Sequence, residues 1–245
     1  MTDAEPDERT TGEDPREGRS PLDSLGTLAV AHVEVADGFE HVEAYTLTGL
    51  LTMLCHGGPE RSDVVLMCGG AMGGLLGPAD GLYHDLGVVL ARRGVGTIRV
   101  GYRRAGDLDR CVHDVLAAAD FAARRGGRRF VVMGHSFGGA VAVNAGIALG
   151  DAAAGVVTLS TQSAGCEEAA ELGATPLLLL HGDRDEILPA FVSEAVRELA
   201  GDSGPRELMI LPGDGHMLQR SAIEIRPRLM QWIGEHLDVD PPQEH

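Results

Sequence analysis

One stretch organises the sequence: Phe130-Val131-Val132-Met133-Gly134-His135-Ser136-Phe137-Gly138-Gly139. It reads as a short apolar strand that runs directly into Gly-x-Ser-x-Gly and then into a helical run of small residues. Only a tight strand-to-helix turn fits this order, and such a turn lifts the side chain of Ser136 out of the sheet edge into a cleft. The glycines at positions 134 and 138 fit because neighbouring side chains would collide in so sharp a bend. The stretch therefore predicts that Ser136 is a nucleophile.

A serine hydroxyl is a weak nucleophile, so it needs a base within hydrogen-bond reach and a third group that orients this base. Ligands of doubly wound sheets gather at the carboxyl ends of the strands, where we therefore expect these partners. The apolar run 177–180 is followed by His181-Gly182-Asp183-Arg184-Asp185, and the run 208–211 by Pro212-Gly213-Asp214-Gly215-His216. The chain order is thus serine, acid, histidine, which is the order of the α/β-hydrolase arrangement.

Strand and helix signals alternate through most of the chain. Apolar and polar residues alternate in stretches between Leu28 and about His56, which predicts antiparallel strands at a sheet edge. Strands are then expected at 64–68, 97–100, 130–133, 156–160, 176–180 and 208–211, and helices at 86–93, 108–125, 140–149, 191–200 and 223–237. This alternation predicts an α/β fold with a doubly wound, mostly parallel sheet. The short segment 161–175 leaves no room for a separate lid domain at that point.

Composition and charge narrow the possible partners. The net charge of -17 argues against binding to nucleic acid and against docking on an anionic membrane. The four cysteines lack the spacing of a disulfide framework or of a zinc site. The N-terminus lacks the apolar core of a signal peptide, and no run is long enough to span a bilayer, so we expect a cytoplasmic protein. Residues 1–20 and 238–245 are expected to be disordered tails on either side of one domain, 21–237.

Taken together, three motifs resemble those of the α/β-hydrolases, and the resemblance covers roughly residues 28 to 237. The motifs are the turn at Ser136, the H-G-x-x-D-x-x-x-P stretch from His181, and the final G-x-G-H. In families with the second motif the acid is the later aspartate, so the resemblance implies Asp185 as the acid and His216 as the base. It also implies an oxyanion hole made by the backbone N–H of Phe137 and of Ala71, with Met72 as the alternative to Ala71. Many relatives have His-Gly where this chain has Gly69-Gly70.

Several residues have simpler interpretations. Asp183 is the alternative acid but also suits a turn that satisfies its own loop backbone, and Asp214 suits a turn in Pro-Gly-Asp-Gly. His135 is expected to pack beneath the site rather than act in it. His56, His113 and His181 are expected to be surface or loop residues without a catalytic role. Ser160, Ser163 and Cys166 are not expected to be nucleophiles, because none stands in a strand-to-helix turn like that of Ser136. The glycine run 69–74 lacks the signatures of a phosphate loop and of a dinucleotide fold, so no cofactor is implied.

These features predict a two-step acyl transfer on Ser136 that ends in hydrolysis. The pocket is expected to be open, with walls from the loop 71–84 and the segment 161–175, and to suit small or medium esters, thioesters or lactones. The resemblance extends to small carboxylesterases and dienelactone-hydrolase-like enzymes without selecting one. Three alternatives remain open: acyl transfer to another acceptor, cleavage of a peptide bond, and a non-catalytic protein of the same fold that only binds a ligand. Neither a metal nor an organic cofactor is implied, and the sequence leaves the oligomeric state open.

Overall fold

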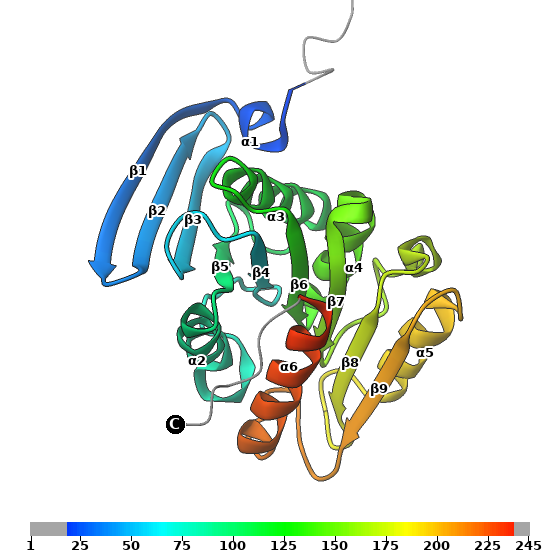
Figure 1. The fold of residues 1–245 in the computed structure, drawn as a ribbon. Coiled ribbons are helices and arrows are strands. Elements are labelled where there is room, and N and C mark those ends of the chain that lie inside the picture. The colour runs from blue at the N-terminus through cyan, green and yellow to red at the C-terminus, as the bar shows by residue number, and fades with distance from the viewer. Residues whose placement is uncertain (1–18, 238–245) are drawn as a thin grey trace, which may run out of the picture.

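A nine-stranded sheet organises residues 19–237, the part of the chain that the computed structural model describes (Figure 1). The strand order is β1-β2-β3-β5-β4-β6-β7-β8-β9. The first three strands and the β3–β5 pair are antiparallel, whereas every pair from β5 to β9 is parallel. The predicted doubly wound, mostly parallel α/β fold is confirmed. Most of the two predicted tails, 1–18 and 238–245, lies outside the described residues.

The elements follow the predicted alternation with shifts of a few residues at most of their ends, and an additional short helix at Pro21–Ser24 precedes them. The strands are β1 Thr27–Ala36, β2 Phe39–Thr46, β3 Gly49–His56, β4 Asp63–Cys68, β5 Gly96–Gly101, β6 Arg129–His135, β7 Ala153–Leu159, β8 Leu177–Gly182 and β9 Arg206–Leu211. The helices are α1 Pro21–Ser24, α2 Pro78–Arg92, α3 Leu108–Ala123, α4 Phe137–Leu149, α5 Phe191–Ala200 and α6 Ala222–His236, with short 3-10 turns η1 Gly150–Ala152 and η2 Ala169–Leu172.

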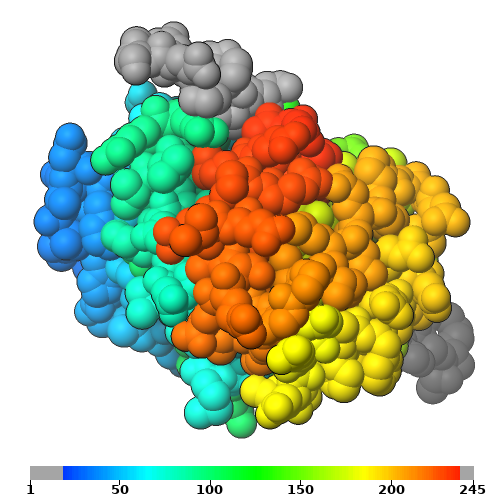
Figure 2. Space-filling model, turned by 90° about the horizontal axis from the view of Figure 1, so that it is seen from below, coloured from blue at the N-terminus to red at the C-terminus, as the bar shows by residue number. Residues whose placement is uncertain are grey.

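Helices cover both faces of the parallel part of the sheet, and the side chains of a strand point alternately into the two layers. In β6, Phe130 and Val132 pack into one core with α3, α4 and α5. The alternate residues Val131 and Met133 pack into a second core with α2 and α6. Figure 2, seen from below, shows α2 beside α6, where Asp85 and Arg226 form an ion pair of 2.5 Å. Burial on both faces explains why the central strands β4, β6, β7 and β8 are largely apolar.

Helix α1 is fastened to α3 rather than left free. Ser20 caps α1, and its hydroxyl donates to Asp120 at 2.5 Å. His113 lies on α3, with Nε2 2.7 Å from the Ser24 hydroxyl and 3.1 Å from the Pro21 carbonyl. Ser20, the last residue of the expected N-terminal tail, is thus tied to the domain by its hydrogen bonds.

Two helices begin earlier than the sequence pattern indicates. Helix α4 starts at Phe137 instead of Ala140, because Ser136 itself occupies the position before the first turn. Helix α2 starts at Pro78 instead of Leu86, but Ala79, Asp80 and Gly81 have positive φ, so a kink separates its beginning from the regular helix that follows. Both changes bring a helix start closer to the carboxyl ends of β4 and β6, where the predicted site lies.

Candidate active site

Ser136 lies in a strained turn between β6 and α4. Its φ of 57° and ψ of -121° fall outside the regions that residues with a side chain prefer. The turn closes only because glycines surround it: a Cβ at Gly134 would overlap the carbonyl of Gly138, and one at Gly138 would overlap that of Gly69. Such an outlier persists only where its surroundings enforce it, and outliers of this kind cluster at functional sites.

Asp185 and His216 are brought together from two loops at the same edge of the sheet. Asp185 follows β8 and His216 follows β9, 31 residues later. Nδ1 of His216 lies 2.7 Å from Oδ2 of Asp185. The side chain of Asp185 is fully buried, and that of His216 is 11% exposed. This bond orients the imidazole and leaves Nε2 as the nitrogen that can accept a proton.

The carboxylate of Asp185 is fixed by its own loop. Its Oδ1 accepts hydrogen bonds of 2.8 Å from the backbone N–H groups of Ile187 and Leu188. Burial alone would raise the pKa of Asp185, but the bonds from Leu188, His216 and Ile187 outweigh it, so the pKa lies below its usual value. The group is therefore an ionised acceptor at neutral pH.

Asp183 and Asp214, the other acidic residues of these loops, have structural partners. Oδ1 of Asp183 accepts a bond of 2.5 Å from the backbone N–H of Gly213. The buried carboxylate of Asp214 accepts from the backbone N–H groups of Gly215, Arg220 and Ser221, just before α6. Both aspartates thus hold the loop that carries His216, and only Asp185 reaches the imidazole.

His181 is not the surface or loop residue that the sequence indicates. It is the penultimate residue of β8 and is completely buried. Its Nε2 lies 2.7 Å from the carbonyl of Leu188 and 3.2 Å from Oδ2 of Asp185, and its Nδ1 lies 2.6 Å from the hydroxyl of Ser193 on α5. His181 therefore clamps the loop that presents Asp185. Its place in the H-G-x-x-D motif was the available signal, but the strand was expected to end at residue 180, so the burial of His181 within β8 was not expected.

His135 packs against His216, as the sequence led us to expect for a residue beside the site. The two ring centroids are 4.8 Å apart, and Nε2 of His135 lies 3.0 Å from the backbone carbonyl of His216. Burial lowers the pKa of His135 to about 4, and the nearby His216 adds to this effect, whereas the bond to the His216 carbonyl acts in the opposite direction. His135 is thus a neutral ring that supports His216.

Ser136 and His216 share one cleft. The cleft has a volume of about 470 Å³ and is lined by the loop 69–77, His135, Ser136, His216 and Met217. The segment 161–175, expected to form a second wall, contributes none of these lining residues. It folds back on α4 instead: Gly165 accepts a bond from the side chain of Asn144, and Cys166 is fully buried.

The loop after β4 passes beside Ser136 as a tight turn. The N–H of Gly73 bonds to the carbonyl of Gly70 at 2.8 Å, which leaves Ala71 and Met72 at the tip. A Cβ at Gly70 would lie 3.8 Å from Cβ of Ser136, so the peptide that carries the N–H of Ala71 runs next to the serine. The side chain of Met72 is 95% exposed.

Two tyrosines that the sequence did not indicate stabilise this loop through hydrogen bonds to its backbone. The hydroxyl of Tyr83 donates to the carbonyl of Cys68 at 2.8 Å, and that of Tyr102 to the carbonyl of Gly69 at 3.1 Å. Their positions on α2 and after β5 give no motif that would reveal these contacts. They provide hydrogen-bonding support where many relatives of the α/β-hydrolases have His-Gly.

The side chains and helices of residues 19–237 also bear on metal binding and on membrane insertion. Within this range, no three or more His, Cys, Asp or Glu residues are grouped so as to hold a metal ion. The four cysteines are buried and unpaired there. No helix of the same range combines the length and the apolar character needed to cross a membrane.

Comparison with protein families and known proteins supplies the identity. The model of the phospholipase/carboxylesterase family matches residues 109–239, which is more than half of the chain and includes Ser136, Asp185 and His216. The chain belongs to this family. It is therefore an α/β-hydrolase that acts on ester bonds. No protein with a curated description matches the sequence significantly.

Several solved structures share the fold of this phospholipase/carboxylesterase family member, although their sequences are only 16–19% identical to it. Est1E from Butyrivibrio proteoclasticus is 16% identical, with a TM-score of 0.65 over 85% of this chain and 99% of its own. XC6422 from Xanthomonas campestris, described as an α/β serine hydrolase without a lid, is 19% identical, with a TM-score of 0.67 over 85% and 100%. Dienelactone hydrolase from Anabaena variabilis is 16% identical, with a TM-score of 0.67 over 81% and 97%. These likenesses confirm the α/β-hydrolase fold.

Proposed function

We propose that this enzyme hydrolyses small or medium carboxylic esters through an acyl intermediate on Ser136. His216 acts as the general base, and Asp185 orients and stabilises it. The observation that carries the proposal is the meeting of three post-strand residues at one cleft: Ser136 and His216 line it, and Asp185 holds His216 from behind at 2.7 Å. A nucleophile, a base in reach of it and a third orienting group form the arrangement that acyl transfer needs.

The proposed reaction has two steps. Nε2 of His216 takes the proton of Ser136 while the serine oxygen attacks the ester carbonyl, and the protonated imidazole then gives this proton to the departing alcohol. Water, activated by the same nitrogen, releases the acid and restores Ser136. The ionised Asp185 stabilises the positive charge that forms on His216 in both steps.

The oxyanion is proposed to bind between two backbone N–H groups. Phe137 is the first residue of α4, so its N–H is free of helical bonding and points out of the helix start. Ala71 is favoured over Met72 as the second donor, because it directly follows Gly70, the residue that abuts Ser136. Loss of one such donor costs on the order of 3 kcal/mol of transition-state stabilisation.

The walls of the cleft favour an apolar acyl or alcohol group. Met72, Leu76 and Met217 line the cleft and are exposed, although large apolar side chains are normally buried. The volume of about 470 Å³ lies at the lower end of the range for small-molecule sites. Thioesters and lactones of similar size would place the same carbonyl on Ser136.

A fluorophosphonate probe tests the nucleophile. Wild-type protein should be labelled on the peptide that contains Ser136, and Ser136→Ala should lose the label. Ser163→Ala is the matched control and should be labelled like the wild type, because Ser163 lies outside the cleft lining. Absence of labelling in the wild type, or equal labelling of Ser136→Ala, would overturn the proposal.

A substrate panel tests the acyl class. p-Nitrophenyl esters of increasing chain length, one thioester and one lactone should show the highest kcat/KM for short or medium acyl groups. Addition of an alcohol or a peroxide should leave the free acid as the main product. A dominant transfer product would instead select the acyltransferase alternative.

A further inference from the structure

A second hollow lies along α2, away from the catalytic cleft. We call it the α2 hollow: it is bordered by the β1–β2 turn at 36–39, by His56, Gly57 and Arg61, and by the face of α2 from His84 to Arg92. Its volume is about 530 Å³. His56 pairs with Thr97 at the beginning of β5, whereas Ser136 follows the end of β6, so the two hollows open at opposite edges of the sheet. They have no lining residue in common.

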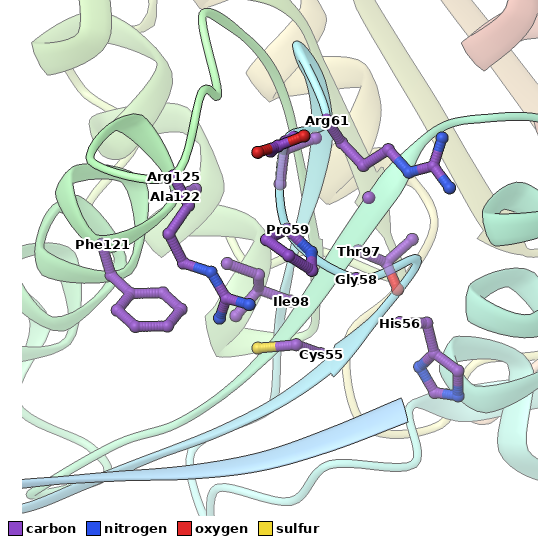
Figure 3. A pocket seen from close by; sticks show the side chains of 13 residues that line it. Cys55, His56, Gly58, Pro59, Arg61, Thr97, Ile98, Phe121, Ala122 and Arg125 are labelled. Carbon is purple, nitrogen blue, oxygen red and sulfur yellow. The ribbon is translucent and has the colours of Figure 1, made fainter. Parts of the chain in front are cut away.

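Unpaired cations surround this hollow. Arg61 and Arg92 line it, and neither contacts a carboxylate in the part of the chain that the structure describes. Nε of Arg61 donates to the carbonyl of Gly57 at 2.7 Å, which fixes the side chain and leaves its terminal N–H groups free. Figure 3 is drawn around a neighbouring pocket that shares His56 and Arg61 with the α2 hollow. It shows the side chains of His56 and Thr97 on one side of β5, and those of Phe121 and Arg125 on the other. Asp37, the acidic residue among the lining residues, is exposed.

A third cation lies beneath the wall of the hollow. Arg99 is 2% exposed and sits over the ring of Phe39, 5.5 Å from its centroid. One terminal nitrogen donates to the carbonyl of Leu75 at 3.3 Å, but the buried Nε has no acceptor. A buried guanidinium without a counter-charge is costly, and a bound anion nearby would reduce this cost. The feature stands out in a chain with a net charge of -17.

Aromatic rings form the rest of the wall. The centroid of Phe39 is 4.3 Å from that of His56 and 6.3 Å from that of His84, and the two histidine rings are 5.3 Å apart. The sequence indicated that His56 is a surface or loop residue, but it is only 5% exposed. Its buried Nδ1 has no hydrogen-bond partner. Burial, aided by electrostatic repulsion from Arg99 and from the ring of His84, lowers the pKa of His56 to about 4.

We propose that the α2 hollow binds a small organic anion: a carboxylate or phosphate carried by an aromatic ring. Arg61 and Arg92 hold the oxyanion through charge-assisted hydrogen bonds, which are the strong ones for such groups. The ring lies against Phe39 and His84. A planar ring suits this wall because aromatic pairs gain from stacked or edge-on contact.

The charge distribution favours a small ligand over a polyanion. Nucleic acid would need an extended basic surface, and the rest of this acidic chain repels it. Two guanidinium groups at an aromatic wall match a single charged group on a ring. The site is independent of the proposed catalysis, because none of its residues belongs to the catalytic cleft.

Binding of phenyl phosphate and benzoate to the full chain tests the proposal by calorimetry and by NMR of the histidine rings. Wild-type protein should bind one of them, and the ring signals of His56 and His84 should shift. Arg61→Gln and Arg92→Gln should each weaken binding by about tenfold or more, since a hydrogen bond to a charged group contributes about 1.5–3 kcal/mol. Arg92 is exposed at the end of α2, so its variant should fold normally even if Arg61→Gln disturbs the loop.

Controls separate this site from the catalytic one. Arg93→Gln, one residue outside the lining set, should bind like the wild type, and so should Ser136→Ala. Bound anion should also raise the pKa of His56, which a ligand in the catalytic cleft would not do. The proposal is overturned if neither probe binds at millimolar concentration, if both arginine variants bind unchanged, or if the signals of His216 shift in place of those of His56. Equally tight binding of inorganic phosphate would overturn the aromatic part of the assignment.

Discussion

The hydroxyl of Tyr102 donates a hydrogen bond of 3.1 Å to the carbonyl oxygen of Gly69. The same ring stands edge-on to Phe137, with centroids 6.5 Å apart and an interplanar angle of 88°. Tyr102 therefore touches both segments that we propose as oxyanion donors, since Gly69 lies two residues before Ala71. We therefore expect its contacts to fix the spacing of these two backbone N–H groups.

Replacement of Tyr102 by Phe should lower kcat with little change in KM. The expected loss is a few-fold to about tenfold, because one neutral hydrogen bond contributes about 0.5–1.5 kcal/mol and the oxyanion forms only during the reaction. Tyr45→Phe is the matched control: its hydroxyl bonds to Glu43 on the exposed side of β2, and both constants should stay unchanged. A Tyr102→Phe variant with wild-type kcat and kcat/KM would show that the loop needs no such support.

Replacement of Asp185 by Asn should reduce kcat by about 10⁴-fold, because an amide at this position favours the wrong imidazole tautomer. Asp183→Asn is a natural comparison two residues away. Asp183 bonds only to the backbone of Gly213, so its variant should lose about 1 kcal/mol of stability or less, with a small effect on kcat. Steady-state kinetics and urea unfolding of both variants separate the two roles. A larger kcat loss in Asp183→Asn would reverse our choice of the acid.

Replacement of Ser193 by Ala should weaken the contacts by which His181 holds the loop of Asp185. The variant leaves Nδ1 of the buried His181 without a partner, which costs about 1–3 kcal/mol of unfolding free energy. Because His181 also contacts the loop 185–188, kcat should fall as well, by less than in Asp185→Asn. Ser203→Ala, an exposed position in the loop after α5, should leave stability and kcat at wild-type values. Unchanged stability of Ser193→Ala would mean that His181 does not depend on this hydroxyl.

The sequence was sufficient to predict features that depend on local order along the chain. The apolar strand before Ser136 and the glycines around it indicate the turn, and parallel strands bring Asp185 and His216 to the same edge. Tyr102 could not be found in this way, because its partner is the backbone carbonyl of Gly69, 33 residues earlier in the chain. The partners of His181 lie within 12 residues of it, but the strand was expected to end at residue 180, so the burial of His181 was not expected. A hydrogen bond to a backbone carbonyl leaves no residue pattern, so such support becomes visible only once the chain is folded.

The wall that the sequence placed at 161–175 illustrates a second limit. This segment is short and contains few large apolar residues, which suggested an open loop beside the cleft. In the fold it packs on α4 because Gly139 leaves room for Thr161, where a Cβ would overlap the threonine side chain. Packing between two small residues carries little sequence signal.

His135 should make stability depend on pH below neutrality. Its pKa falls from the usual 6.5 to about 4 in the folded protein, so the folded state disfavours the charged ring. Well above pH 6.5 the ring is neutral in both states and has no effect. As the pH falls from 6.5 towards 4, the unfolded chain takes up a proton that the folded chain does not, so unfolding becomes easier.

The expected loss from His135 is about 2 kcal/mol between pH 7 and pH 4.5, at 1.36 kcal/mol per pKa unit. Urea unfolding of His135→Gln at both pH values checks this, because glutamine does not titrate but can still donate to the His216 carbonyl. The variant should lose less stability than the wild type between the two pH values. His41→Gln, on the exposed face of β2, should follow the wild type, since its ring is partly exposed and not held in a core. An equal pH dependence in His135→Gln and the wild type would show that burial of His135 does not set this slope.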